Sequence, residues 1–135
     1  MIFKSKVNKK PLFLVEKFYK KNNLKKRYDL TDKNKFLQVS FLNLERKMKS
    51  NPHIHLKHTK QTKISSEAWI VMSGKLKVEF YDHDKSKVYE DILNKGDISI
   101  LFEGGHSFEP LTKNTSIFEI KNGPYMGPKK EKRNF

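Results

Sequence analysis

Residues 64–81 read ISSEAWIVMSGKLKVEFY and contain two predicted strands. The first part, ISSEAWIVM, is rich in apolar and aromatic residues, and Gly74 marks the turn that follows it. In KLKVEFY polar and apolar residues alternate strictly, which is typical of a half-buried strand. We therefore predict a β-hairpin whose second strand directs Leu76, Val78 and Phe80 into a core.

The same signal recurs along most of the chain. Runs of strand-forming residues alternate with turn signals, and they predict further strands at residues 12–19, 36–44, 88–93, 98–102, 106–111 and 116–121. At 12–19 a short helix is the alternative, and residues 1–10 are expected to be loosely attached. Many short strands separated by turns indicate an all-β sandwich or barrel.

The composition narrows the class of protein. A chain of 135 residues corresponds to one domain, and the absence of cysteine excludes disulfides, thiolate zinc sites and cysteine nucleophiles. No stretch approaches the roughly 18 apolar residues of a membrane span, and the first residues lack the apolar run of a signal peptide. We expect a cytoplasmic protein with no membrane partner.

The formal net charge of +14 is concentrated at the two ends of the chain. Residues 1–27 hold ten Lys or Arg and one acid, residues 129–135 hold four and one, and residues 28–128 carry only +2. Solvated basic ends of this kind need no partner, so we do not expect nucleic acid as the main ligand. A nucleic-acid-associated protein that binds through these ends stays as an alternative function.

Three histidines and one carboxylate have the spacing of a metal site on strands. His53 and His55 are two residues apart, so in a strand both imidazoles project from one face. Glu67 and His106 follow on later predicted strands. Imidazoles and a carboxylate suit a divalent transition metal, namely Fe, Mn, Ni, Cu or Zn. The alternative is that the histidines are ordinary loop or pocket residues.

These residues resemble the motifs of the cupins, small jelly-roll barrels of the double-stranded β-helix type. His53-x-His55 with Glu67-x6-Gly74 is similar to the first cupin motif, and the stretch from Gly96 to His106 is similar to the second. Eleven residues separate the second histidine from the glutamate, and a long hairpin at residues 57–65 would accommodate them.

A subgroup of small cupins has this longer spacing, together with segments similar to Gly104-Gly105-His106 and Gly123-Pro124-Tyr125. The resemblance implies a cupin barrel at residues 36–125. A basic N-terminal extension at 1–35 would precede it, and a basic tail at 126–135 would follow it. It also implies a homodimer, for which residues 12–19 are the candidate exchanged strand.

Glu67 has a physical reason to bind a cation. It shares its predicted strand face with Trp69 and Val71, so its carboxylate should point the same way as core side chains. An inward carboxylate is costly unless it is paired or bound to a cation. A salt bridge with a lysine such as Lys60 or Lys63 is the alternative to metal ligation.

Glu119, Lys121 and Tyr125 are candidate catalytic residues. Glu119 and Lys121 share one face of the last predicted strand with Ile117. If that face is the interior, they form an acid/base pair or substrate anchor, with Tyr125 near the mouth of the site. The alternative is that this face is exposed.

The favoured function is a metal-dependent cupin enzyme that acts on a small polar metabolite, such as a sugar derivative or an organic acid. Isomerase, lyase and oxygenase reactions are all compatible with such a site, and the sequence does not select among them. A non-catalytic small-molecule-binding or structural cupin is the alternative.

Overall fold

The computed structural model describes residues 1–17, 27–46 and 48–135. Its regular structure is nearly all β with antiparallel sheets, which confirms the predicted all-β class. Contacts within the chain divide it into two units, a larger one of residues 1–21 and 64–135 and a smaller one of residues 22–63. The division predicted from the sequence, with boundaries at 35 and 125, stays a prediction.

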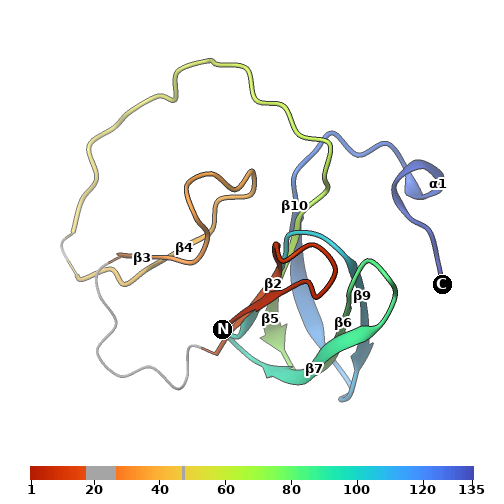
Figure 1. Cartoon of the computed structure of the whole chain (residues 1–135). Helices are drawn as coiled ribbons and strands as arrows, with labels where there is room; N and C mark the ends of the chain where they lie inside the picture. Colours follow the sequence, from red (N-terminus) through yellow and green to blue (C-terminus); the bar gives the residue numbers. More distant parts are fainter. Residues whose placement is uncertain (18–26, 47) are drawn as a thin grey trace. The chain divides into compact units, whose positions relative to one another are not determined.

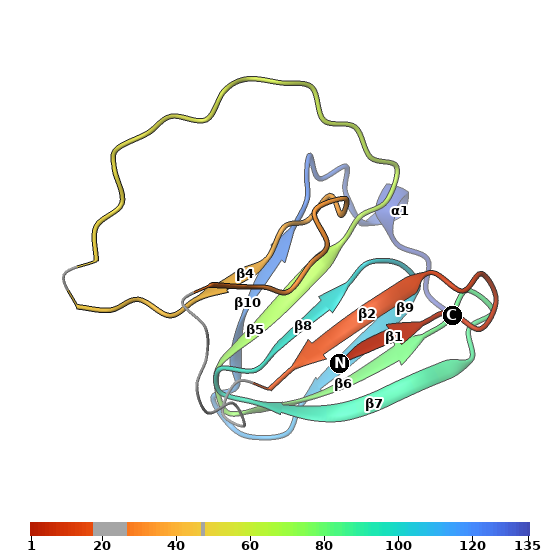
Figure 2. The ribbon, with the colours of Figure 1, turned by 60° about the vertical axis from the view of Figure 1, so that its left-hand side comes forward.

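The larger unit contains a five-stranded sheet, whose neighbouring strands can be followed in Figure 2. In spatial order its strands are β1 (Ile2–Lys4), β2 (Pro11–Glu16), β8 (Ile98–Leu101), β5 (Glu67–Ser73) and β10 (Ser116–Lys121). Because β2, β8 and β5 are interior strands, they have hydrogen-bonding partners on both edges.

A three-stranded sheet forms the second layer of this unit (Figure 1). Its order is β7 (Lys87–Asn94), β6 (Lys75–Tyr81) and β9 (Gly105–Pro110). The core lies between the layers and includes Phe13, Val15, Trp69, Val71 and Leu101 of the large sheet and Leu76, Val78, Phe80 and Leu93 of the small one. In the part of the chain that the structure describes, the two sheets do not close into a barrel.

The two strands predicted within residues 64–81 are confirmed, but their pairing is not. β5 and β6 belong to different sheets, so the turn at Gly74 carries the chain from one layer to the other. Gly74 has a φ of +73°, and a Cβ there would lie 2.8 Å from the Cα of Thr115. The close approach and the left-handed backbone therefore require glycine at this corner. Leu76, Val78 and Phe80 face the core as predicted.

The remaining strands of the larger unit were largely predicted. β7, β8, β9 and β10 end within one residue of the expected limits. β2 covers residues 11–16 of the segment expected at 12–19, which makes that part a strand rather than a helix; residues 18 and 19 lie outside the described residues.

The prediction that residues 1–10 are loosely attached is wrong. β1 pairs with β2, and Ser5 is buried. The Ser5 hydroxyl and the Lys6 amide donate hydrogen bonds to the two carboxylate oxygens of Asp82, each at 2.6 Å. Asp82 directly follows β6, so a buried carboxylate holds the N-terminal turn to a distant part of the sequence.

The smaller unit has one two-stranded sheet, formed by β3 (Arg27–Asp29) and β4 (Ser40–Leu42). The strand expected at 36–44 therefore forms only over its central residues. Before it, the Val39 amide donates to Thr31 Oγ1 at 2.9 Å, and the Gln38 side chain donates to the Asp32 carbonyl at 3.0 Å. These loop hydrogen bonds replace those of a longer ladder.

Two further expectations in this unit are wrong. Residues 53–55 are not in a strand, and the hairpin expected at 57–65 does not form. Pro52 lacks an amide donor, and every side chain from 53 to 63 is exposed. A segment with no buried face has little to fix it as a strand.

The last regular element is the short helix α1 (Pro128–Glu131), which follows β10. In the described residues, no helix has the length and apolar character needed to cross a membrane.

Candidate functional site

Glu67 begins β5 on the face of the large sheet that packs on the core. It shares that face with Trp69 and Val71, and all three residues are 7% exposed or less. The strand register sets Lys121 of β10 opposite Glu67 on one side and Leu101 of β8 opposite it on the other. The inward direction predicted for the Glu67 side chain is therefore confirmed.

The backbone before Glu67 is held by Asn122, the residue after β10. The Ser66 amide donates to Asn122 Oδ1 at 2.6 Å, and Asn122 Nδ2 donates to the Ile64 carbonyl at 3.1 Å. The Ser66 hydroxyl donates to the Phe102 carbonyl at 3.3 Å. These bonds fix the start of β5, so Glu67 and Lys121 keep their register.

His106 reaches the same place from the opposite sheet. It lies in β9 directly across from Phe80, a core residue of β6. The His106 Nε2 atom is 3.4 Å from Glu67 Oε2, and the His106 and Trp69 rings are in edge-to-face contact at 4.9 Å between centroids. An imidazole and a carboxylate from different layers thus meet at the rim of the core.

The three candidate catalytic residues lie beside this pair. Lys121 Nζ is 3.2 Å from Glu67 Oε1 and 2.5 Å from Glu119 Oε1, and it lies 5.2 Å from the centre of the Tyr125 ring. The structure brings together five residues that were predicted separately from the sequence, namely Glu67, His106, Glu119, Lys121 and Tyr125. We call these five residues the Glu67 cluster.

The electrostatics of the cluster favour an ionised carboxylate. Interaction with the His106 ring, and secondly with Lys121, lowers the pKa of Glu67 from 4.5 to about 2 although burial acts in the opposite direction. Glu119 and then Glu67 raise the pKa of Lys121. The cluster therefore holds a stable negative charge at Glu67 with a fixed ammonium beside it.

Three buried polar atoms at this place have no hydrogen-bond partner among the described residues. They are Glu67 Oε2, Trp69 Nε1 and His106 Nδ1. An unsatisfied buried polar group costs about 1–3 kcal/mol, and native structures contain few of them. An acceptor and two ring nitrogens without hydrogen-bond partners, on three side chains that contact one another, indicate capacity for a polar ligand.

Glu67 and His106 fit as two neighbouring ligands of one metal ion. Donors about 2.1 Å from an ion and at right angles to each other are about 3 Å apart, close to the 3.4 Å between Oε2 and Nε2. The Glu67 oxygen on this side, Oε2, accepts no hydrogen bond from the described residues. Within the described residues, however, no three His, Cys, Asp or Glu side chains are grouped to hold a metal.

His53 and His55, the other two expected metal ligands, belong to the smaller unit. Their rings are in edge-to-face contact with centroids 5.3 Å apart, and both side chains are exposed. The His53 Nδ1 atom is 3.0 Å from the Asn51 carbonyl oxygen. The two imidazoles are therefore neighbours, as the spacing predicted, although no strand carries them.

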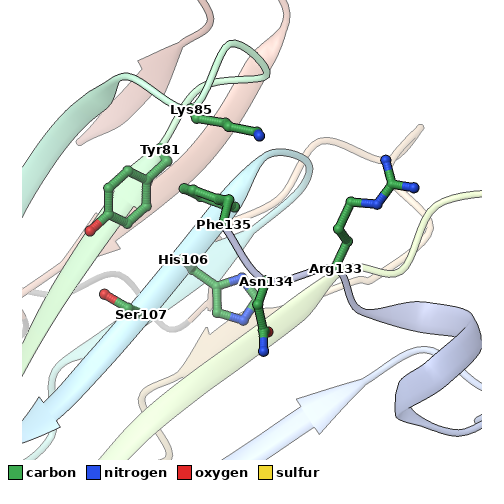
Figure 3. A pocket seen from close by; sticks show the side chains of 7 residues that line it. All are labelled: Tyr81, Lys85, His106, Ser107, Arg133, Asn134 and Phe135. Atoms are coloured by element: carbon green, nitrogen blue, oxygen red, sulfur yellow. The ribbon is translucent and has the colours of Figure 1, made fainter.

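A pocket of about 420 Å³ opens beside His106 (Figure 3). Tyr81 and Ser107 line it together with the last three residues, 133–135. This pocket was not predicted from the sequence, because residues 126–135 have the composition of a solvated basic tail. Phe135 was the available signal, since a large aromatic side chain is unusual in such a tail.

Comparison of the chain with protein-family models, with curated proteins and with solved structures found no match.

Proposed function

We propose that this protein is a cupin-type, metal-binding protein that acts as an enzyme on a small polar metabolite. One observation carries the proposal: Glu67 and His106 come from opposite sheets and meet at 3.4 Å, and the buried Glu67 Oε2 atom at this contact accepts no hydrogen bond from the described residues. Both residues were selected as metal ligands from the sequence alone.

The layout of the larger unit supports the cupin part of the proposal. Glu67 is the first residue of β5, and Gly74 forms the corner after it. Gly96 lies in the turn before β8, and His106 lies in β9. The residues that resemble the two cupin motifs therefore occupy strands and turns in two packed antiparallel layers.

The cluster has the groups that acid/base chemistry needs. Glu67 is ionised at neutral pH and can orient the His106 ring, which lies 3.4 Å from it, and Lys121 can bind or stabilise a negative charge on a substrate. A metal ion held by Glu67 and His106 would act as a Lewis acid or activate dioxygen, and His53 and His55 stay its further ligands predicted from the sequence. Glu119 orients the Lys121 ammonium, and Tyr125 covers it from the outside.

The second candidate function is a metal-free small-molecule-binding protein. The observation in its favour is that Lys121 already supplies a cation at 3.2 Å from Glu67. A carboxylate with a resident ammonium needs no metal for charge balance.

Metal content of the untagged protein, purified without chelator, tests the proposal. We expect about one transition-metal ion per chain, with loss of the metal in Glu67→Gln, His106→Ala and His53→Ala. His58→Ala is the matched control, because His58 lies in the same exposed segment as His53 but outside the motif. Equal loss in the control would contradict a specific site.

Lys121→Gln separates the two candidate functions. If Lys121 alone balances the charge of Glu67, the wild type should bind no metal. Removal of the ammonium should then raise the metal affinity of the variant. If the wild type binds a metal, Lys121→Gln should keep it but lose activity. A wild type and variant that both fail to take up Fe(II), Mn(II), Ni(II), Cu(II) or Zn(II) would refute the metal proposal.

A homodimer is also proposed. In the larger unit β1 and β10 are the end strands of the large sheet, and exposed edge strands invite pairing with a second chain. Residues 11–16 pair with β1 and β8 of their own chain, and their exchange between chains stays a prediction. Sedimentation at several protein concentrations tests dimer formation, and a monomer throughout would refute it.

A further inference from the structure

The pocket beside His106 is built by the end of the chain. Residues 133–135 form one side of it, and Tyr81 of β6 and Ser107 of β9 form the other. Figure 3 shows Phe135 between Lys85 and His106, with Arg133 extending past it. The volume of about 420 Å³ is enough for a small organic molecule.

A glycine allows the last residue to pack there. A Cβ at Gly105 would lie 2.8 Å from Phe135 Cζ, so any larger residue would displace the phenyl ring. The Phe135 and Tyr81 rings meet edge to face, with centroids 5.3 Å apart and planes at 86°. This packing places residues 133–135 against β9, yet 62% of Phe135 stays exposed and open to a ligand.

The pocket has a positive and a neutral end. Lys85 and Arg133 line it, and neither has an ion-pair partner among the described residues; the Lys85 ammonium lies 5.8 Å from the centre of the Phe135 ring. At the other end the Tyr81 and Ser107 hydroxyls both donate to Glu79, so they are already used.

The carboxylate at that end is itself neutralised. Glu79 Oε1 is 2.7 Å from Lys87 Nζ and 3.4 Å from Lys77 Nζ. The positive charges of Lys85 and Arg133 outweigh the main-chain carboxylate of Phe135, so the net charge of the pocket lining is positive. Two unpaired cations next to an exposed aromatic face recognise an anionic group attached to a flat or apolar body.

We propose that this pocket binds a small organic anion, with its phosphate or carboxylate group between Lys85 and Arg133 and its carbon body on Phe135. Such a ligand would lie beside His106, at the outer side of the Glu67 cluster. Anion binding here needs neither a metal ion nor Glu67, so it can be tested in the presence of chelator.

Isothermal titration with four probes tests the charge and the ring separately. Phenyl phosphate carries both, benzoate carries a ring and a carboxylate, inorganic phosphate lacks the ring, and phenol lacks the charge. We expect phenyl phosphate or benzoate to bind at least about 10-fold more tightly than inorganic phosphate and phenol. The tighter of the two identifies the anionic group, and failure of both to bind would overturn the proposal.

Single substitutions test the position. Arg133→Gln and Lys85→Gln should each weaken the tightest probe about 10-fold, the usual loss of one charged hydrogen bond. Lys132→Gln and Lys95→Gln are the matched controls, since each removes one lysine charge outside the pocket, and they should change affinity less than about twofold. Equal weakening in controls and pocket variants would show non-specific attraction and overturn the proposal.

Gly105→Ala tests the role of the packed Phe135. Its new methyl group should displace the phenyl ring and weaken phenyl phosphate and benzoate as much as Phe135→Ala does, with little effect on thermal unfolding. If both variants bind these probes as tightly as the wild type, the aromatic surface is not part of the site. Loss of metal binding with retained anion binding would refute the proposed function alone.

Discussion

Replacement of Glu67 by glutamine should destabilise the fold, and the loss should depend on pH. Glutamine keeps the size and shape of glutamate but removes the charge. In the wild type this charge lies within 3.4 Å of His106 and 3.2 Å of Lys121, on a side chain only 8% exposed. The variant would leave the Lys121 ammonium with Glu119 as its remaining carboxylate.

The size of the effect follows from the pKa. The folded protein lowers the pKa of Glu67 from 4.5 to about 2. Each pKa unit corresponds to about 1.4 kcal/mol, so ionised Glu67 contributes roughly 3 kcal/mol at neutral pH. Because the folded pKa is the lower one, this contribution is complete above the unfolded pKa of 4.5 and disappears as pH falls toward 2.

Urea unfolding of both proteins at pH 7 and pH 3 measures this effect. We expect Glu67→Gln to lower the free energy of unfolding by roughly 3 kcal/mol at pH 7 and by about 1.4 kcal/mol at pH 3. Glu119→Gln is the control, because Glu119 also pairs with Lys121 but its side chain is 37% exposed. Its loss should stay below about 1 kcal/mol at both pH values.

Two results would refute the reasoning. A difference between wild type and Glu67→Gln that is the same at pH 7 and pH 3 would mean that the charge of Glu67 does not stabilise the fold. A loss in Glu119→Gln as large as that in Glu67→Gln would mean that burial of the carboxylate is not what strengthens the interaction.

Other substitutions probe the corner, the N-terminal turn and a buried acid. Gly74→Ala should lower the free energy of unfolding in urea by more than the roughly 1–2 kcal/mol expected for Gly96→Ala. Both glycines have positive φ, but only Gly74 is crowded by neighbouring atoms. Equal losses in the two variants would contradict this. Asp82→Ala should speed tryptic cleavage within residues 1–10, because the Asp82 carboxylate accepts hydrogen bonds from Ser5 and Lys6. Asp84→Ala should not, because the Asp84 carboxylate bonds to the nearby Ser86. Asp97→Asn should raise stability at pH 7, because burial raises the pKa of Asp97 and one of its oxygens has no partner among the described residues; a loss of stability would count against it.

The parts of the fold that could be predicted are those with a strong local pattern. Alternation in KLKVEFY correctly placed Leu76, Val78 and Phe80 in the core, because the side chains of a strand point alternately to its two faces. The same rule predicted that Glu67 points inward with Trp69 and that Lys121 shares a face with Glu119. Face assignment needs no knowledge of which strands pair.

Pairing and long-range anchors could not be predicted in this way. Gly74 signals a turn, but the crowding by Thr115 that makes it a corner between sheets comes from a residue about forty positions away. The bond between Ser5 and Asp82 spans 77 positions and has no sequence pattern. The packing of Phe135 could not be predicted for the same reason, because its contact with Tyr81 exists only after the sheets have formed.

The prediction that the His53 and His55 rings are neighbours is confirmed, but the strand from which it was made does not form. We placed His53 and His55 on a strand because only a strand aligns residues two apart, yet an extended chain without a ladder also brings their rings together. A ligand pair of this kind is less rigid than one on a sheet, because no neighbouring strand fixes its backbone. Part of any metal-binding energy would then be used to order that segment.

The two candidate functions differ in which cation balances the charge of Glu67. Its Oε1 faces Lys121 and its Oε2 faces His106, so the two oxygens divide between an ammonium and an imidazole. A divalent ion bound at Oε2 would lie close to the Lys121 ammonium, and repulsion between the two cations would lower metal affinity. Metal affinity that is unchanged in His106→Ala would show that His106 is not a ligand, and the anion pocket beside it would then be the main binding site of the larger unit.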